Sequence, residues 1–323
     1  MSTTLGDRYS RPMETPPDVV VIGEALVDFV PHRRGALRNA ASFEMHSGGA
    51  PANVAIHAAR NGVRSALVTV VGDDEFGAFL RTQLAAEGVD VRGVRVTNEA
   101  QTGLCFITLD SDGDRSFTHR GGSPSRLLCG EDLQDARLRR ARVLQLSSGP
   151  LRTAEATHAI EAFMERFEGI ICCDPGTCPG HWARPAVIAE RLRRILPRCQ
   201  VVKCADDETR GLTGLTDPAA AARRFVEEGA ELGVVTLGPR GALWARARDT
   251  GRCDAPRVSV VDTTGAGDAF MGALVSGLAR TGTSPSQVDS AALHRMMVSA
   301  CAAGSQAVTR MGSLKPQPVP PCP

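Results

Sequence analysis

Short apolar runs alternate with longer amphipathic segments along most of the chain. Six runs are apolar and short enough to be buried strands: residues 19–23, 66–71, 143–147, 169–174, 201–203 and 233–237. Five segments between them have helical periodicity: residues 51–61, 75–87, 153–167, 185–196 and 217–228. This alternation predicts an α/β fold in which a mostly parallel central sheet lies between two layers of helices.

Two stretches interrupt the alternation, at residues 29–47 and 103–122, and both are richer in turn residues. The second has the pattern of a hairpin whose strands are joined by Asp110-Ser111-Asp112-Gly113. We expect the two stretches to form a small β-lid over the ends of the strands. The predicted organisation is a loose leader (residues 1–17), one α/β domain (18–313) and a proline-rich tail (314–323).

Composition narrows the functional classes. The chain has 323 residues, of which 42% are hydrophobic and 23% charged, and its formal net charge is +1. Neither nucleic acid nor a membrane is expected as a partner, because the charge is near neutral and no apolar run approaches the ~20 residues of a membrane span. The ten cysteines form no CxxC pair, and residues 1–17 lack an apolar export signal. Free thiols in a cytoplasmic protein are therefore expected rather than disulfides or a metal site.

The segment Asp262-Thr263-Thr264-Gly265-Ala266-Gly267-Asp268 carries the clearest chemical signal. It follows an apolar run at residues 258–261, which is predicted to be a strand, and precedes a helical pattern of small residues that extends to about residue 279. A glycine turn that opens a helix presents unpaired N–H groups and the positive end of the helix dipole to an anion. Asp268 lies in the first turn, where a carboxylate of ordinary pKa (~4) is ionised and can take a proton from a nucleophile.

Two other clusters place polar side chains beside glycines. In Ser47-Gly48-Gly49-Ala50-Pro51-Ala52-Asn53, the glycines allow a ligand to approach the backbone, and Asn53 offers both a donor and an acceptor to a polyol. In Gly23-Glu24-Ala25-Leu26-Val27-Asp28, the carboxylate of Asp28 can accept hydrogen bonds from two sugar hydroxyls. Each pattern alone also fits a simpler role, a helix cap for the first and a loop aspartate for the second.

The familiar phosphate-binding loops do not occur in the sequence, which contains neither GxxxxGK[ST] nor GxGxxG. Their absence disfavours an oxidoreductase of the Rossmann type. It also leaves the Gly265-Ala266-Gly267 turn as the predicted anion site.

Four motifs occur in the order found in the ribokinase-like (PfkB-type) carbohydrate kinases. They are Gly23-Glu24-x-Leu26-x-Asp28, Gly48-Gly49-Ala50-Pro51-Ala52-Asn53-Val54-Ala55, Gly72-Asp73-Asp74-Glu75-Phe76-Gly77 and the Asp262 to Asp268 segment. The Gly-Glu opening, followed by Asp28-Phe29-Val30-Pro31, resembles the fructokinase branch most. The resemblance extends over about residues 19–313 and implies a ribokinase-like three-layer α/β/α sandwich with a β-lid.

The resemblance also implies a role for each matching residue. Asp268 corresponds to the catalytic base, and Gly265, Ala266 and Gly267 correspond to the anion hole for the phosphoryl group. The sugar-contacting positions are Asp28, Gly48, Gly49, Asn53 and Arg120. The nucleotide-side positions are Lys203, Glu208, Thr236, Gly238, Gly241 and Cys301, and Glu208 helps to organise Mg²⁺ through water. Asp262 and Thr264, with carbonyls near residues 310–313, correspond to a site for K⁺ or another monovalent cation.

Four positions depart from the family pattern, and one of them is Arg126, which replaces the aspartate of an Ala-Asp pair after the lid. Gly176 and Cys178 replace the polar side chains of an Asp-Pro-Asn-x-Arg segment found in fructokinases, and Cys301 stands where an asparagine near the adenine is common. These differences leave the identity of the acceptor and the nucleotide preference open.

The leading prediction is ATP-dependent, Mg²⁺-assisted phosphorylation of a small sugar, with a ketohexose such as fructose as the first candidate. Other acceptors that remain open are 2-keto-3-deoxygluconate, ribose and a nucleoside. A sensor that binds sugar or nucleotide without turnover is the alternative outside the enzymes. Exposed strand edges in the lid also predict a homodimer that forms through the lid.

Overall fold

The computed structural model describes residues 15–33, 35–109, 115–176, 185–310, 312 and 314. Four features named above lie outside the described residues: most of the leader, the hairpin turn, Cys178 and the tail from residue 315.

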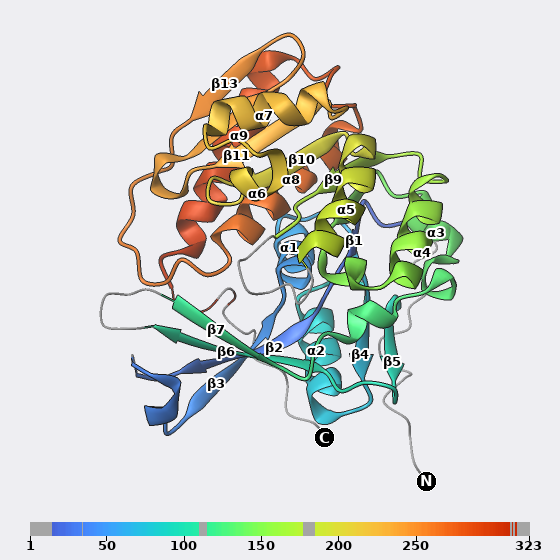
Figure 1. The fold of residues 1–323 in the computed structure, drawn as a ribbon, viewed down its shortest axis with the longest axis vertical. Helices are drawn as coiled ribbons and strands as arrows, with labels where there is room; N and C mark the ends of the chain where they lie inside the picture. Colours follow the sequence, from blue (N-terminus) through green and yellow to red (C-terminus); the bar gives the residue numbers. More distant parts are fainter. Residues whose placement is uncertain are drawn as a thin grey trace.

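A nine-stranded sheet forms the centre of the described part of the chain (Figure 1). Its order is β13-β12-β11-β10-β9-β8-β1-β4-β5, and only the pairs β11–β12 and β12–β13 are antiparallel. The strands are β1 (Val19–Ile22), β4 (Ser65–Gly72), β5 (Val94–Thr97), β8 (Val143–Leu146), β9 (Ile170–Cys173), β10 (Val201–Ala205), β11 (Leu232–Thr236), β12 (Ala242–Ala245) and β13 (Thr250–Cys253). The central parallel strands are buried on both faces, which explains why they appear in the sequence as continuous apolar runs.

Helices cover both faces of this sheet and form a separate apolar cluster on each. One face packs against α1 (Ala50–Arg60), α2 (Glu75–Ala86), α8 (Ala266–Thr281) and α9 (Ser290–Ala307). The other packs against α3 (Ala136–Arg139), α4 (Ala154–Met164), α5 (Pro185–Ile195), α6 (Thr209–Thr213) and α7 (Pro218–Glu227). Short 3₁₀ turns are Leu37–Asn39, Pro124–Leu127, Gly130–Leu133, Gly149–Arg152, Leu196–Arg198 and Gly238–Arg240. The three-layer α/β/α prediction is confirmed.

A second, four-stranded sheet projects from one side of the large sheet (Figure 1). Its order is β3-β2-β6-β7, and its strands are β2 (Leu26–Pro31), β3 (Phe43–Gly48), β6 (Gly103–Leu109) and β7 (Arg115–Arg120). Phe29 stacks on Phe106 at 4.9 Å between ring centroids and meets Phe76 of α2 edge-on at 5.8 Å. These rings attach one face of the second sheet to the body of the molecule. The strands come from the two stretches that predicted the lid, although the first strand begins earlier, at Leu26.

The six strands and five helices predicted from the alternation are all present, and the largest shift of a boundary is at α4, which was predicted to reach residue 167 and ends at Met164. The strand predicted at residues 258–261 is wrong. These residues are irregular, and Val260 is 59% exposed. β-branched residues favour a strand only where another strand can pair with them, and in the described chain this segment crosses from β13 to α8 without one.

Candidate active site

The first turn of α8 has a geometry that favours an anion. Gly265 caps the helix with a left-handed φ of 77°, which a residue with a side chain adopts only under strain. The first amides of a helix lack a preceding helical turn to bond with, and the helix dipole adds positive charge at the same point. Of these amides, Ala266 donates a long bond of 3.5 Å to the carbonyl of Thr263. Ala266 and Gly267, the other two predicted members of the anion hole, are the first residues of this helix.

Asp268 lies in that first turn, and its Oδ2 accepts a hydrogen bond of 2.7 Å from Asn53 Nδ2 at the start of α1. Burial raises the pKa of Asp268 to about 6; the bond from Asn53 and the ammonium of Lys203 oppose the rise, and the charge of Asp174 adds to it. The carboxyl group is therefore mostly ionised at neutral pH but is a stronger base than an exposed aspartate. Asn53 Oδ1 is buried without a hydrogen-bond partner, so it can accept one from a ligand.

Lys203 on β10 brings a positive charge to the same turn. Its Nζ donates to Asp174 Oδ2 at 2.7 Å, and a Cβ placed on Gly267 would lie 3.2 Å from Nζ. Burial alone would lower the pKa of the ammonium, but the charges of Asp174 and Glu208 outweigh burial and raise the pKa above its usual value. Glu208 Oε2 accepts from the backbone N–H of Ala205 at 2.8 Å, which places this carboxylate at the end of β10.

Asp28 lies on β2 of the second sheet, close enough to Asp268 of α8 for the two charges to interact. Its carboxyl group lies so close to the backbone of Gly48 that a Cβ there would be 2.3 Å from Asp28 Cγ. Burial, assisted by the charges of Asp268, Glu24 and Asp262, raises the pKa of Asp28 to about 8. This buried carboxyl group favours a ligand that brings hydrogen-bonding hydroxyls rather than negative charge.

Asp262 organises the turn that precedes α8. Its Oδ1 accepts from the backbone N–H and the Oγ1 of Thr264, at 3.0 and 2.7 Å, and its Oδ2 accepts from the N–H of Gly312 at 2.8 Å. The fold therefore brings together the two segments to which the resemblance assigns a monovalent cation. Residues 311 and 313 lie outside the described residues.

The nucleotide-side residues come from two regions. Thr236 ends β11, and its Oγ1 donates to the carbonyl of Cys204 at 3.3 Å. Gly238 and Gly241 bound the 3₁₀ turn that follows, where the N–H of Leu237 donates to the carbonyl of Gly241 at 2.7 Å. Cys301 is buried in α9 and donates to the carbonyl of Cys253 at 3.8 Å. No described contact joins Thr236, Gly238, Gly241 or Cys301 to Asp268 or Lys203.

Arg120 is the one predicted sugar-side residue that the structure does not bring toward Asp28. The strand register pairs it with Leu104, on the opposite face of the second sheet, and its guanidinium donates to the carbonyl of His119 at 3.0 Å. His46 and Cys105 are instead directly across from Asp28 in the register. Sequence reasoning missed both residues, and only the pairing of β3 and β6 with β2 reveals them. It also missed the contact of Asp174 with Lys203, although Asp174 is the last residue of a predicted strand.

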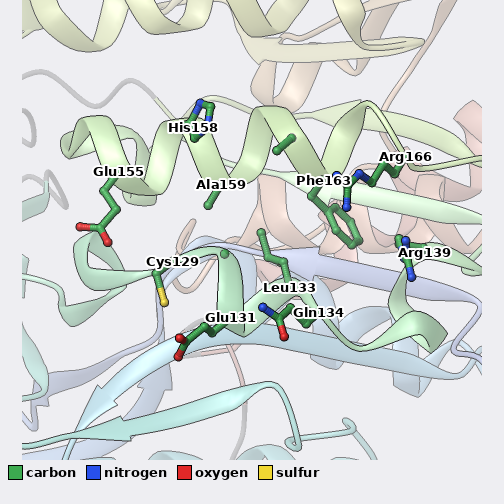
Figure 2. Close-up of a pocket in the computed structure, with 12 residues that line it drawn as sticks. Cys129, Glu131, Leu133, Gln134, Arg139, Glu155, His158, Ala159, Phe163 and Arg166 are labelled. Carbon is green, nitrogen blue, oxygen red and sulfur yellow. The ribbon is translucent and has the colours of Figure 1, made fainter.

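A large groove of about 860 Å³ lies away from these residues, along the outer surface of α4. Figure 2 shows Glu155, His158 and Phe163 of α4 on one side of it, with Arg139 and Arg166 together at one end. No residue of the predicted site lines this groove. It therefore has no part in the chemistry of the cluster around Asp268 and Lys203.

Two features are absent from the described residues. None of their helices is long and apolar enough to cross a membrane. They also contain no group of three or more His, Cys, Asp or Glu side chains arranged to hold a metal ion.

Comparison with known proteins identifies the family of the chain. The model of the pfkB family of carbohydrate kinases matches residues 16–320. Fructokinase-2 of Solanum lycopersicum is 34% identical over 308 residues, which cover 93% of each chain. The solved fructokinase of Vibrio cholerae O395 with fructose, ADP and calcium superimposes with a TM-score of 0.81 at 29% identity, covering 91% of this chain and 94% of that one.

Two further structures have similar folds. A double-mutant form of the Vibrio enzyme contains fructose, ADP and a potassium ion, and gives a TM-score of 0.82 at 28% identity over 93% of this chain and 95% of that one. A fructokinase of Xylella fastidiosa with bound ATP gives 0.81 at 31% identity, covering 91% and 93%. The chain therefore belongs to the pfkB family of carbohydrate kinases and is an ATP-dependent carbohydrate kinase.

Proposed function

We propose that this kinase transfers the γ-phosphoryl group of ATP to a hydroxyl of a ketohexose, with fructose as the first candidate acceptor. The observation that carries the proposal is the 2.7 Å bond from Asn53 to Asp268, because it joins the predicted sugar cluster to the predicted base. The fructokinases of tomato and Vibrio cholerae, to which the chain is similar, support a ketohexose as the acceptor.

In the proposed step, Asp28 and Asn53 hold the sugar through its hydroxyls and Asp268 accepts the proton of the reacting hydroxyl. The hydroxyl oxygen forms a bond to the γ-phosphorus while the bond from that phosphorus to the β-phosphate oxygen breaks. The products are a sugar phosphate and ADP, and the proton remains on Asp268 until it passes to solvent. The amides of Gly265, Ala266 and Gly267 stabilise the negative charge on the transferring group.

Two cations accompany this proposal. Mg²⁺ would neutralise charge on the nucleotide phosphates, and Glu208 fits the task because its carboxylate is an oxygen ligand near Lys203. A monovalent cation such as K⁺ would lie near Asp262 and Thr264, where carboxylate and hydroxyl oxygens are close together. The turn of Thr236, Gly238 and Gly241 would lie along the nucleotide, and Cys301 would lie near its base.

The alternative acceptors remain 2-keto-3-deoxygluconate, ribose and a nucleoside. The non-catalytic sensor is less consistent with the site, because a sensor gains nothing from a buried carboxylate in contact with Asn53 at an anion-binding turn. The second sheet would act as a lid that excludes water from the bound phosphates.

The test is ATP consumption by the wild-type protein with a panel of sugars and nucleosides, followed by the Asp268→Asn variant with the best acceptor. We expect fructose to give the highest kcat/KM and Asp268→Asn to lower kcat by ~10²–10⁴-fold, the usual contribution of a positioned base. Binding of ATP, measured by calorimetry, should change little. Asp217→Asn is the matched control, because it removes a carboxylate at the start of α7 where asparagine caps a helix equally well. Turnover of Asp268→Asn near the wild-type rate would refute the assignment of the base.

A further inference from the structure

Lys203 stands out against the basic residues of the rest of the chain. Of 37 lysines and arginines, only Lys203 and Lys315 are lysines, and Lys203 is the only one in the described residues. Arginine and lysine differ physically, because arginine has a wide planar head and lysine a compact charge with three donors. A lysine in a chain that otherwise uses arginine indicates a position where only the compact ammonium fits.

The surroundings of Lys203 show why the space is limited. Its side chain is 5% exposed, and Nζ lies 3.2 Å from where a Cβ on Gly267 would be, against the first turn of α8. Asp174 holds the ammonium at 2.7 Å. Because Val202 on β10 pairs with Cys173 on β9, the two charged residues follow adjacent paired positions of the rigid sheet. One N–H of the ammonium is engaged by Asp174, which leaves two donors beside the anion-binding turn.

We propose that Lys203 is a catalytic residue that donates hydrogen bonds to the transferring phosphoryl group, and that Asp174 is the positioning residue that holds its ammonium in place. The inference rests on the proposed function and assigns Lys203 to the transferring group itself rather than to the nucleotide in general. While the γ-phosphorus passes from ADP to the sugar oxygen, negative charge spreads over its three outer oxygens. A fixed ammonium stabilises that charge without reorganisation. Lys203 keeps its proton throughout, and Asp268 receives the proton of the hydroxyl.

Lys203 and Asp174 have opposite effects on the pKa of Asp268. The ammonium of Lys203 lowers the pKa of Asp268, and the carboxylate of Asp174 raises it; Asn53 also faces Asp268 and lowers its pKa by a hydrogen bond. Loss of Lys203 should therefore move the acid limb of the kcat/KM profile to higher pH, and loss of Asp174 should move it to lower pH. These shifts test whether both charges lie beside Asp268 in the working enzyme, whereas the loss of kcat tests the contact of Lys203 with the phosphoryl group.

The first measurement compares Lys203→Met, Lys203→Arg and Asp174→Asn with the wild type, and uses Arg64→Met as a control. Arg64 also forms an ion pair, at 2.7 Å with Asp18, but this pair lies at the amino ends of β1 and β4. We expect Lys203→Met to lower kcat by ~10²–10³-fold, as the loss of one donor to a developing charge does, with less than a tenfold change in the Kd of ATP. Arginine should not restore kcat, and Arg64→Met should keep the wild-type rate and profile.

Lys203→Met leaves a buried carboxylate without its cation, so a second variant guards against misfolding. The double variant Lys203→Met with Asp174→Asn removes both charges and should show the same loss of kcat. If the wild type phosphorylates a sugar but the double variant keeps nearly the same kcat, the inference is overturned and the kinase function stands. If the wild type phosphorylates none of the acceptors, the proposed function fails. Binding of ADP with aluminium fluoride, a mimic of the transferring group, then tests the inference. Equal affinity in the wild type and the double variant overturns it. A loss of affinity of tenfold or more in the double variant supports it.

Discussion

Two carboxyl groups, Asp268 and Asp28, are close enough for their charges to interact, and burial raises the pKa of both. The sequence predicts the place of Asp268 in the first turn of a helix, together with an ordinary pKa near ~4. In the structure Asp268 lies at the predicted place, but burial raises its pKa to about 6. Burial also raises the pKa of Asp28, to about 8. Spacing in the sequence identifies such residues. It cannot give their burial, which depends on how α1, α8, β2 and β10 come together.

The first prediction concerns the pH dependence of turnover. Asp268 must be deprotonated to accept a proton, so kcat/KM should fall as the pH drops through about 6, the raised pKa of this group in the folded protein. Steady-state kinetics with saturating ATP, at a series of pH values below neutrality, would measure this fall of kcat/KM. A midpoint near the ordinary value for aspartate would show that the carboxyl group is not buried in the working enzyme.

The second prediction concerns Asp28 and stability. Since its pKa is raised to about 8 in the folded state, the folded protein holds a proton that the unfolded chain releases near pH ~4. The contribution of this group to the free energy of unfolding is fully present below pH ~4 and is lost as the pH rises through about 8. Asp28→Asn should therefore raise the free energy of unfolding at pH 8 by roughly 1–3 kcal/mol, the cost of a buried group without partners, and change it little near pH 4.

Urea denaturation at the two pH values measures this difference, with Asp217→Asn as the control. The same substitution should weaken sugar binding above about pH 8, where Asp28 is ionised, because an amide accepts fewer hydrogen bonds from hydroxyls than a carboxylate does. A loss of stability at pH 8 would contradict the prediction.

At the scale of single elements, the motif Gly72-Asp73-Asp74-Glu75-Phe76-Gly77 has a clear structural role. Asp74 caps α2 by accepting from the N–H of Gly77 at 2.8 Å. Its carboxylate also accepts from the hydroxyl and the N–H of Thr102, at 2.7 and 2.8 Å. The motif therefore ties α2 to the segment that leads into β6 of the second sheet.

The third prediction follows from this double role. Asp74→Ala should lower the free energy of unfolding by roughly 2–3 kcal/mol, because it removes a helix cap and also leaves the groups of Thr102 without their acceptor. Asp217→Ala is the matched control, since that carboxylate caps α7 through Ala220 alone and should cost only ~1 kcal/mol. Chemical denaturation of both variants makes the comparison. Equal losses would show that the bonds to Thr102 contribute nothing.

Elements differed in how well the sequence predicted them. Buried parallel strands such as β4 and β11 were predicted because burial on both faces leaves an uninterrupted apolar run. The run at residues 258–261 has similar composition but lies on the surface, where Val258, Val260 and Val261 are 38%, 59% and 41% exposed. Strand propensity reports the local backbone, whereas a strand also requires a neighbour. The edge strands β12 and β13 and the helix α9 were not predicted.

At the scale of the whole molecule, the order of the strands decides what the site contains. The chain runs from β1 to β4 and β5 on one side and then from β8 outward on the other, so the order reverses between β1 and β8. Ligands of such sheets bind at the carboxyl ends of the strands at this reversal. Glu24 after β1 lies 4.0 Å from Arg152 after β8 there, close to Asp28. The alternation of elements predicted a parallel sheet, but not this order, because the sequence does not show which strands are adjacent.

The last prediction is the homodimer expected through the second sheet. In the described chain, β3 and β7 are the outer strands of this sheet, and Phe117 on β7 is 45% exposed. Exposed strand edges and apolar side chains favour pairing with another copy, and a charge placed on the edge prevents it. Phe117 pairs in register with Ile107, two residues from Cys105, and so lies on the same face as Asp28.

We therefore expect a dimer in sedimentation velocity over a wide range of protein concentration, and a monomer for Phe117→Lys. Val298→Lys is the control, because Val298 is equally exposed, at 45%, but lies on α9. A monomeric wild type would exclude the dimer. A dimer that both lysine variants retain would place the contact elsewhere on the molecule, and the second sheet would then have to cover the acceptor without support from a partner.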